Sequence, residues 1–375
     1  MGKSAASSAR MLLALLTALH LTVDGVCGAA LECHAVALPD WERVLWLFAL
    51  YNLVAFGGQW LAGLVLDVCP RCRPWAIPAA MVALWLGGAV PMAGSMVQVL
   101  CLGVGNCLFH AEGGRQVLLR HAGFTGPGVF VSSGAIGLAL GLGGVVGPLP
   151  FLLLGTAVAV GAMALMHREL LHRAGEGSTP ITGEVCQSAT PGGCLPVFPA
   201  ITLKTRATLA ACLALLLGCV ILRGFGGGAT PGHVLLLPCV FAAGKALGGL
   251  CCDALGYKRC VLLVFALGFV ALQGSGLPAL LLLALALNMT MPLTLRLAHW
   301  CAPQYPGLMF GLAAGCLLPG AFFRQDFPVG PHAMLVLVFL ALTAAGALLA
   351  SLGRLSRAPN PSTQTTPGSG NAAVA

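Results

Sequence analysis

Apolar residues dominate this chain in long stretches that short polar segments interrupt at fairly regular intervals. Each stretch is roughly 20 residues long, the length that an α-helix needs to cross the hydrocarbon core of a bilayer. Such stretches are too long for the alternating strands of a membrane β-barrel. We therefore predict an all-α integral membrane protein with about 12 transmembrane helices. The expected spans are residues 10–31, 43–66, 75–94, 97–119, 124–146, 148–167, 206–227, 231–252, 259–276, 277–297, 306–324 and 333–353.

A short polar pattern recurs half a chain length away, each time at the end of one apolar stretch. The first copy contains Gly63, Asp67, Arg71 and Arg73, and the second contains Gly249, Asp253, Lys258 and Arg259. The glycine, the aspartate and the last arginine have the same spacing in both copies. A charged turn at the same point of two hydrophobic halves indicates a duplicated helical bundle, which is the architecture of many secondary transporters.

The chain divides into four parts by composition. Residues 1–167 are predicted to form an N-terminal six-helix bundle and residues 206–353 a C-terminal six-helix bundle. Residues 168–205 are polar and rich in glycine and proline, which suits a cytoplasmic linker between the two halves. Residues 354–375 have the composition of a disordered tail.

The charge content agrees with a membrane protein and suggests an orientation. Only 8% of the residues are charged and 58% are hydrophobic, whereas a soluble domain carries about 25% charged residues. With the N-terminus in the cytoplasm, every Lys and Arg, Lys245 among them, falls on the inner side except Arg43, Arg223 and Arg324. This bias predicts that both termini are cytoplasmic. Because the positive charge is distributed in this way, the net charge of +8 does not indicate a nucleic-acid partner.

Two features at first suggest other kinds of protein. Lys3 and Arg10 precede the first apolar stretch as in a signal sequence, but Asp24 interrupts that stretch and no clear cleavage site follows, so we expect a retained helix. Cys69 and Cys72 form a CxxC pair without a second pair to complete a four-cysteine metal site. No Walker loop, HExxH motif or serine-hydrolase elbow occurs, so we expect neither an enzyme nor a bound metal or cofactor.

Ionisable residues inside the apolar stretches are candidates for function, because they are costly in lipid unless they are paired or face a cavity. His20 and Asp24 lie about one helical turn apart near mid-membrane and therefore share a helix face. Such a pair could bind and release a proton as access alternates between the two sides of the membrane. It could equally be a structural pair that fixes the first helix to a neighbour.

Further polar residues lie in the fourth, seventh and tenth stretches. Glu112 and Arg115 have the spacing of an ion pair, for which we expect a mainly structural role. His110 points to the other side of its helix, either into a central cavity or into ordinary packing. Asn288 could hydrogen-bond to a neighbouring helix or to a substrate. We expect Arg223 to extend to the membrane interface, although it could also attract an anionic group.

Taken together, these residues resemble the major facilitator superfamily. In that family a Gly-x-x-x-Asp turn with basic residues follows helices 2 and 8, and the second copy here, from Asp253 to Arg259, is close to that form. The first copy differs by Pro70 and Cys72. The segments "HLTVD", "DVCPRCRPWAIPAAM" and "GVGNCLFHAEGGRQ" are similar to the fosmidomycin-resistance-type branch, with Ala111 in place of its proline. The resemblance implies that the turns are gate latches, in which Asp faces a helix N-terminus or pairs with Arg.

The expected function is secondary active transport of a small solute by alternating access. The resemblance implies proton-coupled efflux of a drug-like molecule or a metabolite. Uptake of a solute is an alternative, and so is a transporter-like scaffold or assembly factor. We expect a monomer in the plasma membrane or the bacterial inner membrane, with the lipid bilayer, the solute and protons as its partners.

Overall fold

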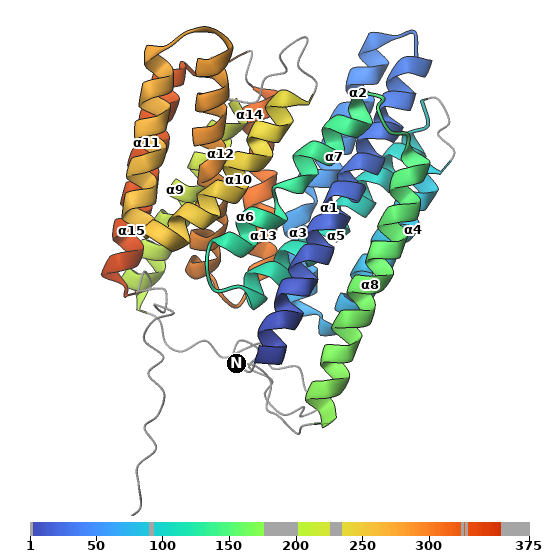
Figure 1. Ribbon diagram of the computed structural model, residues 1–375, viewed down its shortest axis with the longest axis horizontal. Helices are drawn as coiled ribbons and strands as arrows, with labels where there is room; N and C mark the ends of the chain where they lie inside the picture. Colours follow the sequence, from blue (N-terminus) through green and yellow to red (C-terminus); the bar gives the residue numbers. More distant parts are fainter. Residues whose placement is uncertain are drawn as a thin grey trace, which may run out of the picture.

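The computed structural model describes residues 3–89, 94–175, 202–225, 235–323, 326 and 329–353. The described part is all-helical and forms two bundles, one from each half of the chain (Figure 1). The predicted tail and residues 176–201 of the predicted linker lie outside the described residues.

The first half contains six helical units, two of which are broken. The elements are α1 (Lys3–Ala37), α2 (Trp41–Asn52), the π-helical η1 (Leu53–Gly57), α3 (Gln59–Val68), the 3-10 turn η2 (Pro70–Cys72), α4 (Arg73–Gly88), α5 (Met96–Arg120), α6 (Thr125–Phe130), α7 (Ser133–Leu142) and α8 (Pro148–Gly175). The units Trp41–Val68 and Thr125–Leu142 each run through a break. Helix α8 continues eight residues beyond the predicted end of its span, at residue 167.

The second half repeats this arrangement. Its elements are α9 (Leu203–Phe225), α10 (Leu236–Leu255), α11 (Tyr257–Gln273), α12 (Gly276–Cys301), α13 (Pro306–Gly315), α14 (Leu317–Phe322) and α15 (Pro331–Ser351). Helices α13 and α14 form one unit with a break at Cys316. The predicted set of 12 helices is therefore confirmed, and eight of them are long and apolar enough to cross a membrane.

Helices α1 and α7 pack closely against each other within the first bundle. These two helices approach along Gly134, Gly137 and Gly141, where a side chain would overlap the opposite helix. On Gly137, for example, even a Cβ atom would overlap the carbonyl oxygen of Leu21. The absence of side chains on one helix thus allows two backbones to touch.

The two halves meet at the end of the molecule that carries Asp67 and Asp253, which we call the latch side. There α3 packs against α13, and α6 packs against α10 (Figure 1). Phe310 of α13 joins the hydrophobic core of the first half, and Phe124, just before α6, joins that of the second. The ribbons of α7 and α10 diverge toward the other end of the molecule.

Candidate functional site

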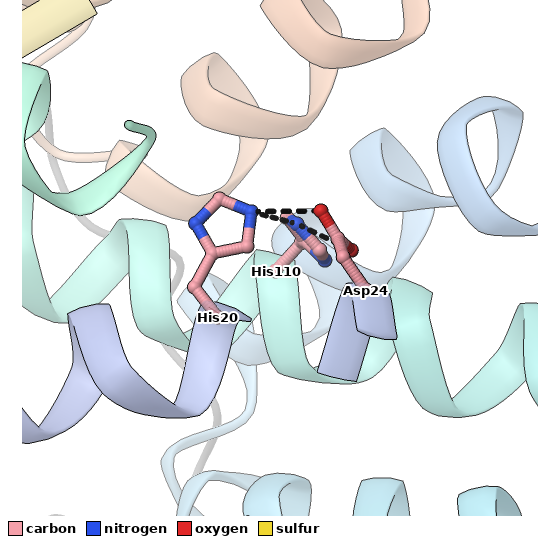
Figure 2. Close-up of side chains that lie close together, drawn as sticks. All are labelled: His20, Asp24 and His110. Carbon is pink, nitrogen blue, oxygen red and sulfur yellow. Dashed lines mark hydrogen bonds and ion pairs between the residues drawn. The ribbon is translucent and has the colours of Figure 1, made fainter. Parts of the chain in front are cut away.

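Three ionisable side chains meet in the interior of the first bundle. His20 and Asp24 extend from α1 and His110 from α5 (Figure 2). The Nε2 atom of His20 lies 3.2 Å from the Asp24 carboxylate and 2.8 Å from Nε2 of His110. His110 Nε2 is 3.7 Å from the same carboxylate. Both histidines are 5% exposed, so this cluster lies away from bulk water and lipid.

The hydrogen bonds of the histidines determine how many protons the cluster holds. Nδ1 of His20 lies 2.7 Å from the carbonyl of Phe130, and Nδ1 of His110 lies 2.9 Å from the carbonyl of Asn106. Because a carbonyl only accepts hydrogen bonds, both Nδ1 atoms carry hydrogen. If both rings are neutral, each Nε2 then carries a lone pair and no hydrogen. A hydrogen bond between the two Nε2 atoms, which lie 2.8 Å apart, therefore requires one further proton. The 2.8 Å separation therefore fits a cluster with one proton more than two neutral histidines, beside the carboxylate of Asp24.

Asn106, which also lies on α5, completes the cluster. Its amide nitrogen donates to Asp24 Oδ1 at 2.8 Å, whereas its own Oδ1 is buried and accepts no hydrogen bond. Asn106 precedes His110 by four residues and therefore shares its helix face. That spacing could have identified Asn106 from the sequence.

The three donor atoms of His20, Asp24 and His110 lie within 4.8 Å of one another, which is close enough to hold a metal ion. A divalent cation would have to replace the proton shared between the histidines, since it needs the same Nε2 lone pairs. The ammonium of Lys245 also acts electrostatically on Asp24 and His110, and its charge opposes any added positive charge there, a divalent cation more than a proton. Proton binding therefore fits the surroundings better.

Lys245 and Arg223 lie on the second half and differ from their predicted positions. Lys245 is in the middle of α10 and partly buried, not at the end of the helix where the sequence placed it. Arg223 is only 9% exposed and donates to Thr290 Oγ1 at 3.5 Å, so the prediction that it extends to the interface is wrong. The sequence does not give the rotation of a helix, and the rotation decides which way these long side chains point.

Aromatic rings close the space between the cluster and the latch side. Phe130, whose carbonyl holds His20, packs against Phe109 at 6.1 Å and against Phe310 of the other half at 5.9 Å between ring centroids. Phe130 is fully buried and Phe310 is 3% exposed. On this side the cluster is therefore covered by residues from both halves.

The first latch joins α3 to α13. Asp67 accepts hydrogen bonds from the backbone N–H groups of Gly307 at 3.2 Å and Leu308 at 2.9 Å, at the N-terminus of α13. Arg115 Nε lies 3.2 Å from the same carboxylate. A carboxylate at a helix N-terminus is stabilised by the unpaired N–H groups there. Gly63, one turn earlier, touches the backbone of Gly307, which lets the two helices meet.

The second latch joins α10 to α6 in the equivalent way. Asp253 accepts from the backbone N–H groups of Phe124 at 2.9 Å and Thr125 at 2.8 Å, and from the Thr125 hydroxyl at 2.6 Å. Gly249 touches the backbone of Phe124 and Thr125. This aspartate is exposed, whereas the side chain of Asp67 is 1% exposed. The two latches therefore share one design but differ in burial.

The basic residues of the two turns have different surroundings. Arg73 donates to the carbonyls of Leu66 at 2.8 Å and Asp67 at 3.0 Å and so holds the end of α3. Arg71, Lys258 and Arg259 are exposed, and no ion pair joins them to an aspartate within the described ranges.

Arg296 joins the two halves at a point that sequence reasoning missed. It is 1% exposed, and its guanidinium donates to the carbonyls of Leu118 and Gly123 at 3.0 Å each, and to that of His121. A guanidinium is suited to this position because several of its N–H groups point outward in one plane.

The remaining predicted site residues lie outside the cluster. Glu112 and Arg115 approach to 3.7 Å, and Gln116 also donates to Glu112, next to the first latch. Asn288 donates to the carbonyl of Ala284 on its own helix at 2.9 Å. Cys72 donates to the sulfur of Cys69 at 3.0 Å in the turn after α3.

Comparisons with known proteins give similarity in structure only. No known protein family and no curated protein matches the sequence. A crystal structure of a major facilitator superfamily transporter, FucP, in the outward conformation is similar with a TM-score of 0.48 and 13% identity, covering 94% of this chain and all of that one. A bacterial homologue of the iron transporter ferroportin in an outward-facing state is similar with a TM-score of 0.49 and 15% identity, covering 93% of this chain and 99% of that one.

Proposed function

We propose that this protein is a proton-coupled secondary transporter that moves a small solute by alternating access. The observation that carries the proposal is the 2.8 Å separation of the Nε2 atoms of His20 and His110 beside Asp24, which fits a shared proton. A buried site in which two nitrogens share a single proton can release that proton when its surroundings change. Rocking of the two halves would provide that change by opening the site to one side or the other.

Alternating access also requires a closed state that can open again, and the latches meet this requirement. Asp67, Asp253 and Arg296 all bind backbone groups of the opposite half. These contacts can break without unfolding either bundle, because each bundle has its own hydrophobic core. The present arrangement corresponds to a state closed on the latch side, which we propose to be cytoplasmic.

We further propose that the transporter works as a monomer in a plasma or bacterial inner membrane on a drug-like or metabolite solute. Efflux in exchange for protons is the direction that the sequence resemblance implies. Uptake together with protons is the second candidate, and the positive charge of Lys245 near Asp24 favours it. A scaffold protein would need neither a buried proton-binding site nor contacts between the halves that can open and close.

The proposal can be tested without knowing the solute. Spin labels on Leu119 of α5 and Leu255 of α10, both exposed near the latch side, would report the separation of the halves. In a bilayer, a change from pH 8 to pH 5 should shift the distribution of distances in the otherwise unchanged protein. Asp24→Asn should abolish this shift, because it removes the charge that balances the proton.

Asp40→Asn is the matched control, since Asp40 is exposed and caps α2 within its own half. It should leave the pH-dependent shift intact. Identical distance distributions at both pH values in the protein with native Asp24 would refute proton coupling. Transport in proteoliposomes then follows, with a solute library and an imposed pH gradient.

A further inference from the structure

In the part of the chain that the structure describes, two basic side chains of the second half, the buried Arg223 and the partly exposed Lys245, have no acidic partner. Within the described residues, neither Arg223 of α9 nor Lys245 of α10 forms an ion pair. The one hydrogen bond from Arg223 is the 3.5 Å contact with Thr290, whose hydroxyl proton is already donated to Leu287. A buried cation without a counter-charge is unfavourable, and such residues are retained where a ligand supplies the charge.

Both cations lie beside the 287–290 segment of α12. Thr290 contacts Arg223, and Asn288 packs against Gly244, the neighbour of Lys245. The two side chains also interact electrostatically with each other. They therefore form one positively charged region on the second half.

This region faces the proton-binding cluster of the first half. The backbone of Lys245 touches Gly128 of α6, two residues before Phe130, whose carbonyl holds His20. Lys245 is partly exposed, and it acts electrostatically on both Asp24 and His110. The exposed part of Lys245 therefore lies at the interface between the halves, where a transported solute would bind.

We propose that the solute is an organic anion whose carboxylate, phosphonate or sulfonate group binds between Arg223 and Lys245, and that it crosses the membrane together with the proton. The inference rests on the transport function proposed above. An oxyanion would accept charge-assisted hydrogen bonds from the free N–H groups of both side chains. A cationic solute would be repelled at the same place.

The direction of coupling follows from the charges around Asp24. The groups that face it are His20 and Cys27 on its own helix, Asn106 and His110 of α5, Tyr51 of α2 and Lys245 of α10, while α7 offers the backbone at Gly134. An anion bound to Lys245 cancels the charge that keeps protons away from the cluster. Anion binding and proton binding then favour each other, which is the requirement for movement in the same direction.

Binding can be measured on the purified full-length protein in detergent. The probes are methylphosphonate, lactate, benzoate and benzenesulfonate, with benzyl alcohol and benzyltrimethylammonium as neutral and cationic counterparts. At least one anion should raise Tm, by mass action, and the counterparts should not. Lys245→Gln and Arg223→Gln should each weaken that binding by about 10- to 100-fold. Lys204→Gln, an exposed change on α9, should leave it unchanged.

Proteoliposomes with an internal pH dye give the coupling. Addition of the stabilising anion outside should acidify the interior faster than in protein-free liposomes, because the protein carries the proton in with the anion. Alkalinisation would overturn joint movement, and stabilisation or flux with only the cationic or neutral compound would overturn the anion assignment. Absence of stabilisation by all four anions would also overturn it. In each of these cases, the pH-dependent change in the distance between spin labels on Leu119 and Leu255 tests separately whether transport is coupled to protons.

Discussion

The carboxylate of Asp67 accepts the backbone N–H of Leu308 at 2.9 Å although 241 positions separate the two residues in the chain. The contact joins the end of α3 in the first half to the start of α13 in the second. It is therefore a direct chemical link between the repeated turn of one half and a helix terminus of the other.

Removing the charge of Asp67 should favour opening on the latch side. Asp67→Asn keeps the shape of the side chain but weakens its bonds to Gly307 and Leu308 and leaves Arg115 without its anion. Hydrogen bonds to charged groups contribute about 1.5–3 kcal/mol each, so the open population should rise at least about tenfold. The distance between spin labels on Leu119 and Leu255 measures it. An unchanged distribution would show that this contact does not hold the halves together.

The equivalent change in the second half should have a smaller effect. Asp253 is exposed, and water can replace part of what Phe124 and Thr125 donate to it. We expect Asp253→Asn to raise the open population by about threefold, with the same labels as the measurement. An effect as large as that of Asp67→Asn would contradict the role given to burial.

The contact between α1 and α7 predicts a selective loss of stability. Gly137→Ala places a methyl group against the carbonyl of Leu21, which should cost about 1–3 kcal/mol through overpacking. Thermal unfolding in detergent should show a Tm several degrees lower. Gly218→Ala on α9 is the matched control, since no atom lies within 4 Å of the added Cβ. Equal Tm values for the two variants would rule out tight packing at Gly137.

The turn after α3 predicts selective thiol chemistry. A hydrogen bond from the Cys72 thiol lowers the pKa of Cys69, and the same bond raises the pKa of Cys72. Because the thiolate is the nucleophile, an excess of Cys69 thiolate is expected as pH rises toward the ordinary value of about 8.5. Brief treatment with a maleimide at pH 7 should therefore modify Cys69 before Cys72, as read by peptide mass spectrometry.

A maleimide that cannot cross the membrane also tests the orientation of the protein in the bilayer. It should reach Cys69 only from the cytoplasmic side and Cys33, exposed near the other end of α1, only from the opposite side. Labelling of both cysteines from one side would contradict the proposed topology.

The sequence predicts the helices of this fold well, because long apolar stretches and charged turns depend on local composition. It does not predict the breaks at Leu53–Gly57 and near Val131 and Cys316. Glycine and serine residues next to these breaks, such as Gly57–Gly58 and Ser132–Ser133, permit a kink, but helix packing decides whether the backbone bends there.

The candidate site was predictable only within a single helix. The shared face of His20 and Asp24 follows from their spacing, and so does the ion pair of Glu112 with Arg115. The meeting of His110 with His20, and the position of Lys245 across the interface, depend on helix rotation and on the docking of the two halves. Neither quantity can be obtained from one sequence.

The unequal burial of the two latches has a kinetic consequence. The exposed Asp253 contact can exchange with water at low cost, so we expect α6 and α10 to separate before α3 and α13 do. Solvent then first reaches the interior along the α6–α10 flank, past Lys245, while the other flank is still closed. A chain whose two halves repeat the same turn thus has an opening path without two-fold symmetry.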